Sequence, residues 1–249
     1  MNRIPCIIGN WKMYKTAAEA RLFISALSGE ILITERRVFL SVPFTAIDAA
    51  ADASTGTNIA IGAQNMHDHM EGAFTGEISA RMLKASGATF VILGHSERRH
   101  YFKETNLFIH NKLIRSLHEG LTPILCIGEL LHERENGTYE KVLKLHLEEC
   151  LKDLSLSQAS QMIIAYEPLW AVGTGKAATP DIAQEVHCFI RNWLEERFNR
   201  ETAERICLVY GGSVRPDNIE ALMQQTDVDG VLVGGASLDA KLFAQIVNY

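Results

Sequence analysis

The sequence predicts an α/β fold, a single (β/α)₈ barrel domain over residues 1–249 with eight parallel strands at its centre. Short apolar runs rich in β-branched residues recur eight times and alternate with longer amphipathic stretches. Several of these runs, such as Ile7-Ile8 and residues 90–93, have no polar alternation, which is typical of parallel strands covered on both faces. A doubly wound open sheet is the alternative arrangement of the same elements.

The expected strands are separated by segments long enough to form helices. They cover residues 4–9, 37–42, 58–63, 90–93, 122–127, 162–165, 206–210 and 230–233. A chain of 249 residues is within the size range of one α/β barrel, and no linker or low-complexity segment divides it. We therefore expect one domain.

Helix signals lie between these strands. Thr16 followed by Glu19 matches a capping box, and Thr179 followed by Pro180 offers a cap and a proline that the first turn tolerates. Asn218 marks a further helix start. The capping box predicts a helix over residues 16–27, and apolar spacings of three and four predict helices over residues 139–151 and 179–198.

Composition excludes several classes of partner. The chain is 47% hydrophobic and 22% charged, as is ordinary for a globular protein. Its formal net charge of −6 argues against a broad surface for nucleic acid or for an anionic membrane. No apolar run approaches the roughly 20 residues that a membrane-spanning helix needs. We expect neither nucleic acid nor a membrane as a partner.

The five cysteines are isolated from one another along the chain. Cys6, Cys126 and Cys207 lie in expected strands, so buried free thiols are predicted. No Cys-x-x-Cys pair or other metal-ligand spacing is apparent, and no signal peptide is recognised. These features favour a reducing, cytoplasmic location. Asp229 and Asp239 are expected at the surface.

The segment after the sixth strand is the most informative part of the chain. The strand leads to Glu167, and Pro168 ends it because proline removes a backbone donor. Trp170, Gly173 and Gly175 follow, so the loop is apolar and can bend. Such a loop beside a carboxylate is typical of a lid that expels water from a site. Taken alone, a simple surface loop is the more common interpretation.

Other polar residues and glycines follow the remaining strands, on the barrel face where active sites form. These are Asn10 and Lys12, His95 with Ser96 and Glu97, Gly211 with Gly212 and Ser213, and Gly234 with Gly235. Glycines at strand ends let backbone N–H groups approach an anion, and the last two loops of such barrels often hold a phosphate. Singly, each residue has an ordinary structural interpretation. Together they predict proton transfer beside a carbonyl of a small phosphorylated substrate.

These residues lie in motifs that resemble the triosephosphate isomerase family, and the match runs essentially from Ile7 to the C-terminus. The motifs are Gly9-Asn10-Trp11-Lys12-Met13, Gly62-Ala63-Gln64-Asn65, Gly94-His95-Ser96-Glu97-Arg98-Arg99, Cys126-Ile127-Gly128-Glu129, the Glu167 loop, Tyr210-Gly211-Gly212-Ser213-Val214, and Val233-Gly234-Gly235-Ala236-Ser237. The resemblance implies a TIM barrel that interconverts dihydroxyacetone phosphate and D-glyceraldehyde 3-phosphate in glycolysis and gluconeogenesis. It implies no cofactor and no metal.

The resemblance also assigns catalytic roles. Glu167 would move a proton between two carbons through an enediol(ate). His95 would polarise the carbonyl and move protons between the oxygens; the family's histidine is neutral because a helix N-terminus disfavours its charged form. Lys12 would offset the negative charge of the substrate, and Asn10 would help to hold it.

Phosphate and lid contacts are implied in the same way. Tyr210 is an expected partner of the closed lid, near Ala178 and Gly175, and Glu129 is expected to bond Trp170 in the open form. The phosphate would be held by the backbone N–H groups of Gly173, Ser213, Gly234 and Gly235. Ser213 would also contact the lid.

The family is usually a homodimer. Phe74-Thr75-Gly76-Glu77 matches the tip of a loop that projects into the second subunit, so Thr75 and Glu77 are expected at the interface. Met13 lies in the loop that this tip would approach. Arg98 is expected to pair with Glu77 of the second subunit.

Two other functions stay open at this point. Another phosphate-binding barrel enzyme, such as an aldolase or lyase, would need a Schiff-base lysine at a strand end or a metal cluster. A non-catalytic barrel used for binding would be expected to lack Glu167, His95 or the lid, and this sequence has all three.

Overall fold

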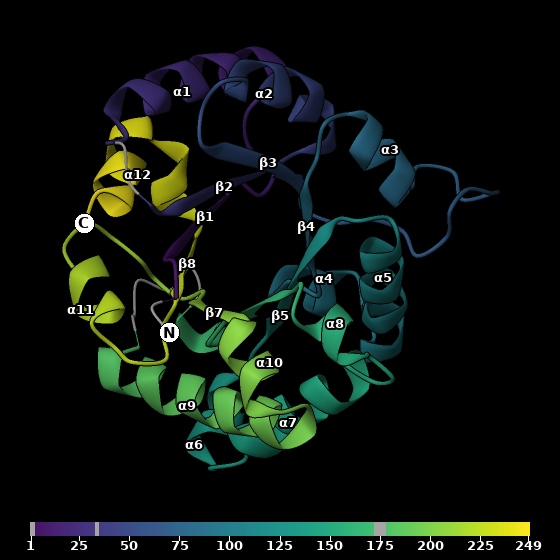
Figure 1. The fold of residues 1–249 in the computed structure, drawn as a ribbon, viewed down its shortest axis with the longest axis vertical. Coiled ribbons are helices and arrows are strands. Elements are labelled where there is room, and N and C mark those ends of the chain that lie inside the picture. Colours follow the sequence, from purple (N-terminus) through teal and green to yellow (C-terminus); the bar gives the residue numbers. More distant parts are fainter. Residues whose placement is uncertain (1–2, 33–34, 172–177) are drawn as a thin grey trace.

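Eight parallel strands form a closed barrel in sequence order, surrounded by helices (Figure 1). The structure is a computed structural model that describes residues 3–32, 35–171 and 178–249. The barrel closes because β1 pairs with β2 on one side and with β8 on the other. The predicted (β/α)₈ barrel is therefore confirmed, and the doubly wound open sheet is excluded because such a sheet would leave two strands with an unpaired edge.

Every expected strand is present, and its bounds differ from the expected ones by at most two residues. The strands are β1 (Cys6–Asn10), β2 (Arg37–Val42), β3 (Ile59–Ala63), β4 (Phe90–Leu93), β5 (Thr122–Ile127), β6 (Ile163–Tyr166), β7 (Cys207–Tyr210) and β8 (Gly230–Val233). The first strand was expected from residue 4 but starts at Cys6, whose N–H donates to Asp229 O at 3.0 Å. Pro5 has no N–H to extend this ladder.

The helices follow the strands around the outside of the barrel. They are α1 (Ala17–Glu30), α2 (Ile47–Ser54), α3 (Ala80–Ala85), α4 (Ser96–Tyr101), α5 (Asn106–His118), α6 (Leu131–Glu135), α7 (Tyr139–Cys150), α8 (Leu156–Ala159), α9 (Pro180–Arg197), α10 (Arg200–Arg205), α11 (Ile219–Met223) and α12 (Ala240–Val247). The capping box of Thr16 with Glu19 is present, and Thr179 caps α9 with Pro180 in its first turn. Short 3₁₀ turns are η1 (Phe44–Ala46), η2 (Leu169–Ala171) and η3 (Gly235–Leu238). No helix among the described residues is long and apolar enough to cross a membrane.

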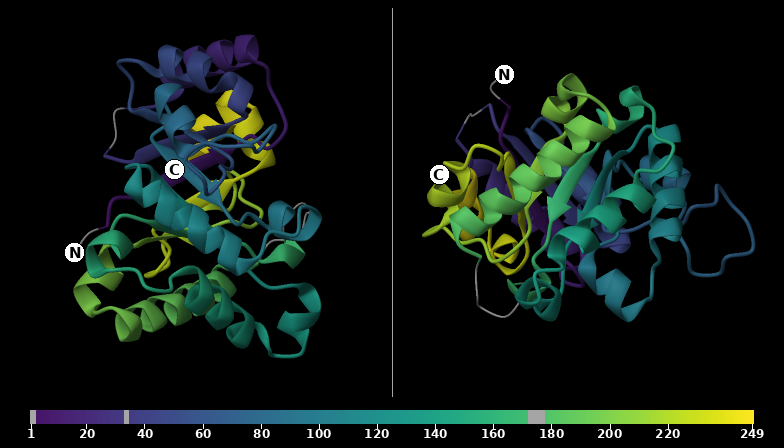
Figure 2. Two further views of the ribbon diagram at one scale, coloured as in Figure 1. Left: turned by 90° about the vertical axis from the view of Figure 1, so that its right-hand side faces the viewer. Right: turned by 90° about the horizontal axis from the view of Figure 1, so that it is seen from below.

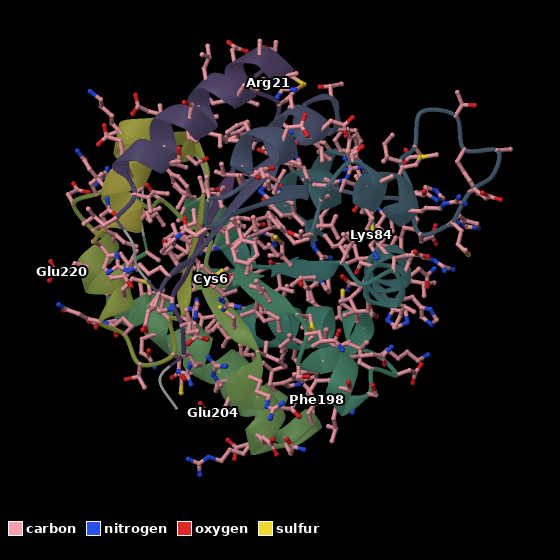
Figure 3. The ribbon with its side chains drawn as sticks, turned by 45° about the horizontal axis from the view of Figure 1, so that its top comes forward. Cys6, Arg21, Lys84, Phe198, Glu204 and Glu220 are labelled. Atoms are coloured by element: carbon pink, nitrogen blue, oxygen red, sulfur yellow. The ribbon has the colours of Figure 1, made fainter. Side chains whose placement is uncertain are left out.

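Strand side chains alternate between two apolar layers. Ile8 belongs to a cluster made of strand residues inside the barrel, whereas Ile7 belongs to the larger cluster between the strands and the helices. This double burial is the reason for the continuous apolar strands in the sequence. Cys6, Cys126 and Cys207 are buried free thiols, as predicted. Figure 3 shows Cys6 inside the ring of helices.

The prediction that Asp229 lies at the surface was wrong. Its side chain is buried and accepts hydrogen bonds from Arg191 at 2.6 Å and from Leu208 N at 2.8 Å, and Arg3 pairs with the same carboxylate. Buried charges are stable when paired and hydrogen-bonded in this way. Asp239 is exposed and caps α12 through hydrogen bonds to Lys241 N and Leu242 N.

The loop over residues 64–79, between β3 and α3, projects from the body of the barrel (Figures 1 and 2). Its two arms are joined at the foot, where His67 N donates to Ile78 O at 2.8 Å. Near the tip, Glu77 N donates to Phe74 O at 3.0 Å and forms a tight turn. Thr75 and Glu77, which lie at the loop tip, are therefore exposed to solvent in the single chain.

Candidate active site

A cavity of about 510 Å³ opens where the strands end. Its wall joins residues from five strand ends that are far apart in the sequence, because parallel strands in a barrel all end on one face. Among them are Asn10, Lys12, His95, Glu167, Gly211, Gly212, Ser213, Gly234 and Gly235. The structure thus brings together the residues that the sequence analysis selected after the first, fourth, sixth, seventh and eighth strands.

Glu167 is held in place by the strand that precedes it. Its N–H donates to Ile127 O at 2.8 Å and so extends the ladder by one residue before Pro168. The side chain is buried, with one carboxylate oxygen accepting from Ser96 N at 3.0 Å and the other 3.1 Å from His95 Nε2. A Cβ at Gly128 would lie 1.8 Å from Glu167 O, so the backbone can approach this closely only at a glycine.

His95 is the N-cap of α4, and its ring is oriented by that helix. Nδ1 accepts a hydrogen bond from Glu97 N at 3.2 Å. An imidazole nitrogen that accepts carries no proton, so the neutral ring has its proton on Nε2, the atom that faces Glu167. The helix N-terminus therefore fixes a tautomer that presents an N–H donor to the cavity.

Lys12 adopts a backbone conformation that is rare for a residue with a side chain, with φ of 52°. Two contacts hold it: Lys12 N donates to Asn10 Oδ1 at 3.0 Å, and Gln64 Nε2 donates to Lys12 O at 2.6 Å. Its ammonium group lies 2.7 Å from Glu97 Oε1. Such backbone strain persists only where the surroundings fix it, and it clusters at functional sites.

The turns after β7 and β8 provide free backbone donors. The N–H groups of Ser213, Gly234 and Gly235 donate no hydrogen bond to any described residue. The carbonyl groups around them are engaged, with Asn218 Nδ2 donating to Ser213 O and Ser237 donating to Gly234 O. A Cβ at Gly235 would meet nothing within 4 Å, so the turn is open to the cavity. These unused N–H groups can bind an anion.

Glu129 joins the start of the expected lid to the barrel. Its buried carboxylate accepts from Tyr166 Oη and from Trp170 Nε1, both at 2.9 Å. Burial raises the pKa of Glu129 above its ordinary value, although the hydrogen bonds from Trp170 and Tyr166 oppose this effect. Leu169 N donates to Glu129 O at 3.1 Å, so the turn that follows Pro168 is fastened at two points.

Tyr210 joins the far end of the same loop to the barrel. Its buried hydroxyl accepts from Ala178 N at 3.1 Å. Burial raises the pKa of Tyr210 to about 12, so the hydroxyl stays protonated. A Cβ at position 212 would lie 2.1 Å from Tyr210 Oη, so only glycine at this position leaves enough space for the hydroxyl. Gly173 and Gly175 lie outside the described residues.

Two of the four residues expected at a subunit interface, Met13 and Arg98, line a second, smaller cavity of about 270 Å³ next to Lys12, whereas Thr75 and Glu77 lie on the projecting loop. Met13, Arg98 and Gln64 contribute to its wall. The side chain of Met13 is 93% exposed in the single chain. Within the chain, Arg98 Nε donates to Glu104 Oε1 at 2.6 Å.

Three of the contacts that arrange this site could not be predicted from the sequence. Ser96 N holds the Glu167 carboxylate, Gln64 holds the Lys12 carbonyl group, and Glu97 pairs with the Lys12 ammonium group. The sequence does contain a signal for each, because Gln64 follows the third strand and the other two follow the fourth. The direction in which each side chain points was not available from that position.

Comparison with known proteins agrees with this site. Residues 5–249 match the family described as "Triosephosphate isomerase". A protein of that name from Protochlamydia amoebophila is 49% identical over 247 residues, which cover 99% of this chain and 94% of the relative. Proteins of the same name from Solibacter usitatus and Moorella thermoacetica are 48% and 49% identical, with 99% of this chain and 100% and 99% of the relatives covered. The chain belongs to the triosephosphate isomerase family.

Proposed function

We propose that the chain interconverts dihydroxyacetone phosphate and D-glyceraldehyde 3-phosphate by proton transfer through an enediol(ate). The observation that carries this proposal is the pairing of Glu167 with His95 Nε2 across 3.1 Å, in a cavity that also receives Lys12 and two glycine turns. Membership of the family and the names of the relatives support the same reaction. The enzyme is an intramolecular aldose–ketose isomerase.

In this proposal, the substrate inserts between the two partners of that contact. Its carbonyl oxygen accepts the Nε2 proton of His95, and the C–H of the adjacent carbon faces Glu167. Glu167 removes this proton to give the enediol(ate) and delivers a proton, which can exchange with solvent at this stage, to the neighbouring carbon, while His95 moves a proton between the two oxygens. Protons and charge balance without a cofactor.

Lys12 has an electrostatic role in this scheme. Its ammonium group already compensates one carboxylate, that of Glu97 at 2.7 Å. A dianionic phosphate and a developing enediolate in the cavity would draw the same cation, and a fixed positive charge in a water-poor site stabilises such an anion strongly. Asn10 contributes by holding the Lys12 backbone in its unusual conformation.

The phosphate is assigned to the free N–H groups of Ser213, Gly234 and Gly235. They lie on the same cavity wall as Lys12, so the charged end and the reacting carbons of a three-carbon substrate can both be held. Gly173 is proposed as a further donor from the lid. This arrangement favours a small phosphorylated substrate over a larger one.

Residues 168–178 are proposed as the lid over this cavity. Its described ends are fastened by the Trp170–Glu129 contact and by the Ala178–Tyr210 contact. The Trp170–Glu129 contact is the one expected in the open form, and the Ala178–Tyr210 contact is the one expected in the closed form. We propose that closure breaks the first contact and keeps the second while the lid, including Gly175, moves over the cavity. A closed lid excludes water, which strengthens electrostatic stabilisation and prevents loss of phosphate from the enediolate.

A test compares wild type with Glu167→Gln, using D-glyceraldehyde 3-phosphate and NADH-coupled reduction of the ketone product. The matched control is Glu220→Gln, since Glu220 is exposed on the outer helix α11 (Figure 3). The proposal expects rapid turnover in wild type and control and its loss in Glu167→Gln. Absence of isomerisation by folded wild type would instead favour another phosphate-binding barrel enzyme, such as an aldolase or lyase.

The homodimer is a further part of the proposal. The projecting loop with Thr75 and Glu77 and the exposed Met13 support it, because a single chain would leave these groups in water. In the dimer, the loop tip would enter the second cavity of the partner, beside Lys12. Arg98 keeps its bond to Glu104 through Nε, and its other nitrogens remain to pair with Glu77 of the second subunit.

The cellular setting is also proposed. An equilibrium between two triose phosphates serves glycolysis in one direction and gluconeogenesis in the other. Free cysteines are the normal state in a reducing compartment, so we assign the enzyme to the cytoplasm. Fractionation of cells followed by immunodetection of the chain tests this assignment.

A further inference from the structure

The foot of the projecting loop carries three adjacent side chains with metal-ligating atoms, His67, Asp68 and His69. In the part of the chain that the structure describes, this is the one grouping of at least three His, Cys, Asp or Glu residues whose ligand atoms all lie within 4.8 Å of one another. None of its residues lines the active-site cavity.

Two separations between ligand atoms are close to those around a small divalent ion, and all three ligand atoms lie within 4.8 Å of one another. Asp68 Oδ1 lies 2.8 Å from His69 Nδ1 and 3.2 Å from His67 Nδ1. An ion about 2.0–2.2 Å from each of two ligands holds them about 3.0–3.4 Å apart in octahedral or tetrahedral coordination. Small adjustments of the side chains therefore bring the carboxylate and both imidazoles to one ion.

Neighbouring residues hold these three side chains in position. Phe74 packs against both imidazoles, with ring centroids 4.3 Å from His67 and 4.5 Å from His69. Asn111 Nδ2 donates to Asp68 Oδ2 at 3.3 Å and leaves Oδ1 directed at the histidines. Such outer contacts orient ligands in metal sites.

Access to the cluster is from one side. The side chains of His67 and Asp68 are 13% and 12% exposed, whereas that of His69 is 57% exposed. His67 Nδ1 accepts from the backbone N–H of His69 at 3.2 Å, so this nitrogen carries no proton and has a lone pair for a metal ion. An ion can enter past His69 and exchange this weak contact for coordination.

We propose that His67, Asp68 and His69 form a binding site for a divalent transition-metal ion of the Zn²⁺ type. Two imidazoles and one carboxylate suit Zn²⁺, Ni²⁺ or Cu²⁺, and water completes the coordination. Mg²⁺ and Ca²⁺ prefer oxygen ligands and do not fit this set. The ion is not part of the isomerase reaction, because the site lies outside the catalytic cavity.

The site has a consequence for the loop. Phe74 packs on the two imidazoles and directly precedes Thr75 at the loop tip. An ion that fixes both rings restrains this packing and stabilises the loop in the arrangement seen. Binding of the ion to the folded chain then raises the midpoint of thermal unfolding by mass action.

The test is calorimetric titration of the full chain with ZnCl₂ and, separately, with MgCl₂. Wild type is compared with His69→Gln, which changes an exposed side chain, and with Asp68→Asn. The matched control is His132→Gln, since His132 is exposed on α6 and outside the cluster. We expect one Zn²⁺ site in wild type and control, weakened at least about tenfold in both cluster variants, and no Mg²⁺ binding.

Thermal unfolding provides a second readout with the same proteins. Zn²⁺ is expected to raise the unfolding midpoint of wild type and of His132→Gln and to leave that of His69→Gln unchanged. Zn²⁺ binding by His69→Gln with the affinity of wild type would overturn the proposal. So would equal weakening in His132→Gln, or the absence of Zn²⁺ binding by wild type.

Discussion

Acid should destabilise the fold through one buried histidine, His187. It lies in α9, with its ring 5.9 Å from that of Tyr166 in β6. Nδ1 donates to the main-chain oxygen of Asp227 at 3.1 Å, and Nε2 has no hydrogen-bond partner among the described residues. Protonation of Nε2 would place an unpaired charge in the protein interior.

The magnitude follows from the pKa of His187. Burial lowers it from an ordinary 6.5 to about 4, although the hydrogen bond to Asp227 opposes this effect. As the pH falls, His187 is therefore protonated in the unfolded chain before it is protonated in the folded chain. The contribution of neutral His187 to the free energy of unfolding is complete above pH 6.5 and is lost as the pH falls toward 4. The full loss is about 3 kcal/mol, and the loss between pH 7.5 and pH 5 is about 2 kcal/mol.

The assay is urea-induced unfolding at pH 7.5 and pH 5, at one protein concentration, for wild type and His187→Asn. Asparagine keeps a donor close to Asp227 O but does not titrate. The variant is expected to be less stable at both pH values because it leaves a cavity. Its free energy of unfolding should nevertheless fall by about 2 kcal/mol less than that of wild type between the two pH values.

Equal pH dependence in the two proteins would refute this reasoning. It would mean that protonation of His187 does not destabilise the folded chain. His146, whose pKa burial lowers to about 3, is present in both proteins and cancels in the comparison. A difference between wild type and variant therefore reports on His187 alone.

Three further predictions concern the site and the interface. Glu167→Asp retracts the carboxylate by about 1.5 Å and should lower kcat at least about a hundredfold with a smaller change in KM; unchanged kcat in the coupled assay would remove the base assignment. Gly212→Ala should displace the Tyr210 hydroxyl and lower both kcat and the unfolding midpoint, whereas Gly29→Ala, whose Cβ meets nothing within 4 Å, should lower neither. Thr75→Arg should weaken the dimer and its activity together in sedimentation and rate measurements; a fully active dimer of unchanged affinity would contradict the interface.

The sequence was sufficient to predict the barrel. Eight apolar runs separated by segments long enough for helices leave few ways to bury all strands, and the caps at Thr16 and Thr179 mark helix starts by local chemistry alone. The first residue of the first strand could not be predicted from the local sequence. It depends on the pairing of Cys6 with Asp229 O, a contact between residues more than 200 positions apart.

The candidate site could be selected from the sequence only as a set of positions. A strand end fixes where a residue lies, but not which atom its side chain meets. The tautomer of His95 depends on Glu97 N, and the place of Glu167 depends on Ser96 N. The buried state of Asp229 was missed for the same reason, since its partner Arg191 is remote in the sequence.

The central claim is that a proton, and not a hydride, moves between two carbons of the substrate. Its most direct test is turnover of D-glyceraldehyde 3-phosphate in D₂O, with the product analysed by NMR. Proton transfer through Glu167 allows exchange with solvent at the enediol(ate) stage, so deuterium should appear on the carbon that receives the proton. Complete turnover to a product without deuterium would show direct transfer between the carbons and would contradict the account.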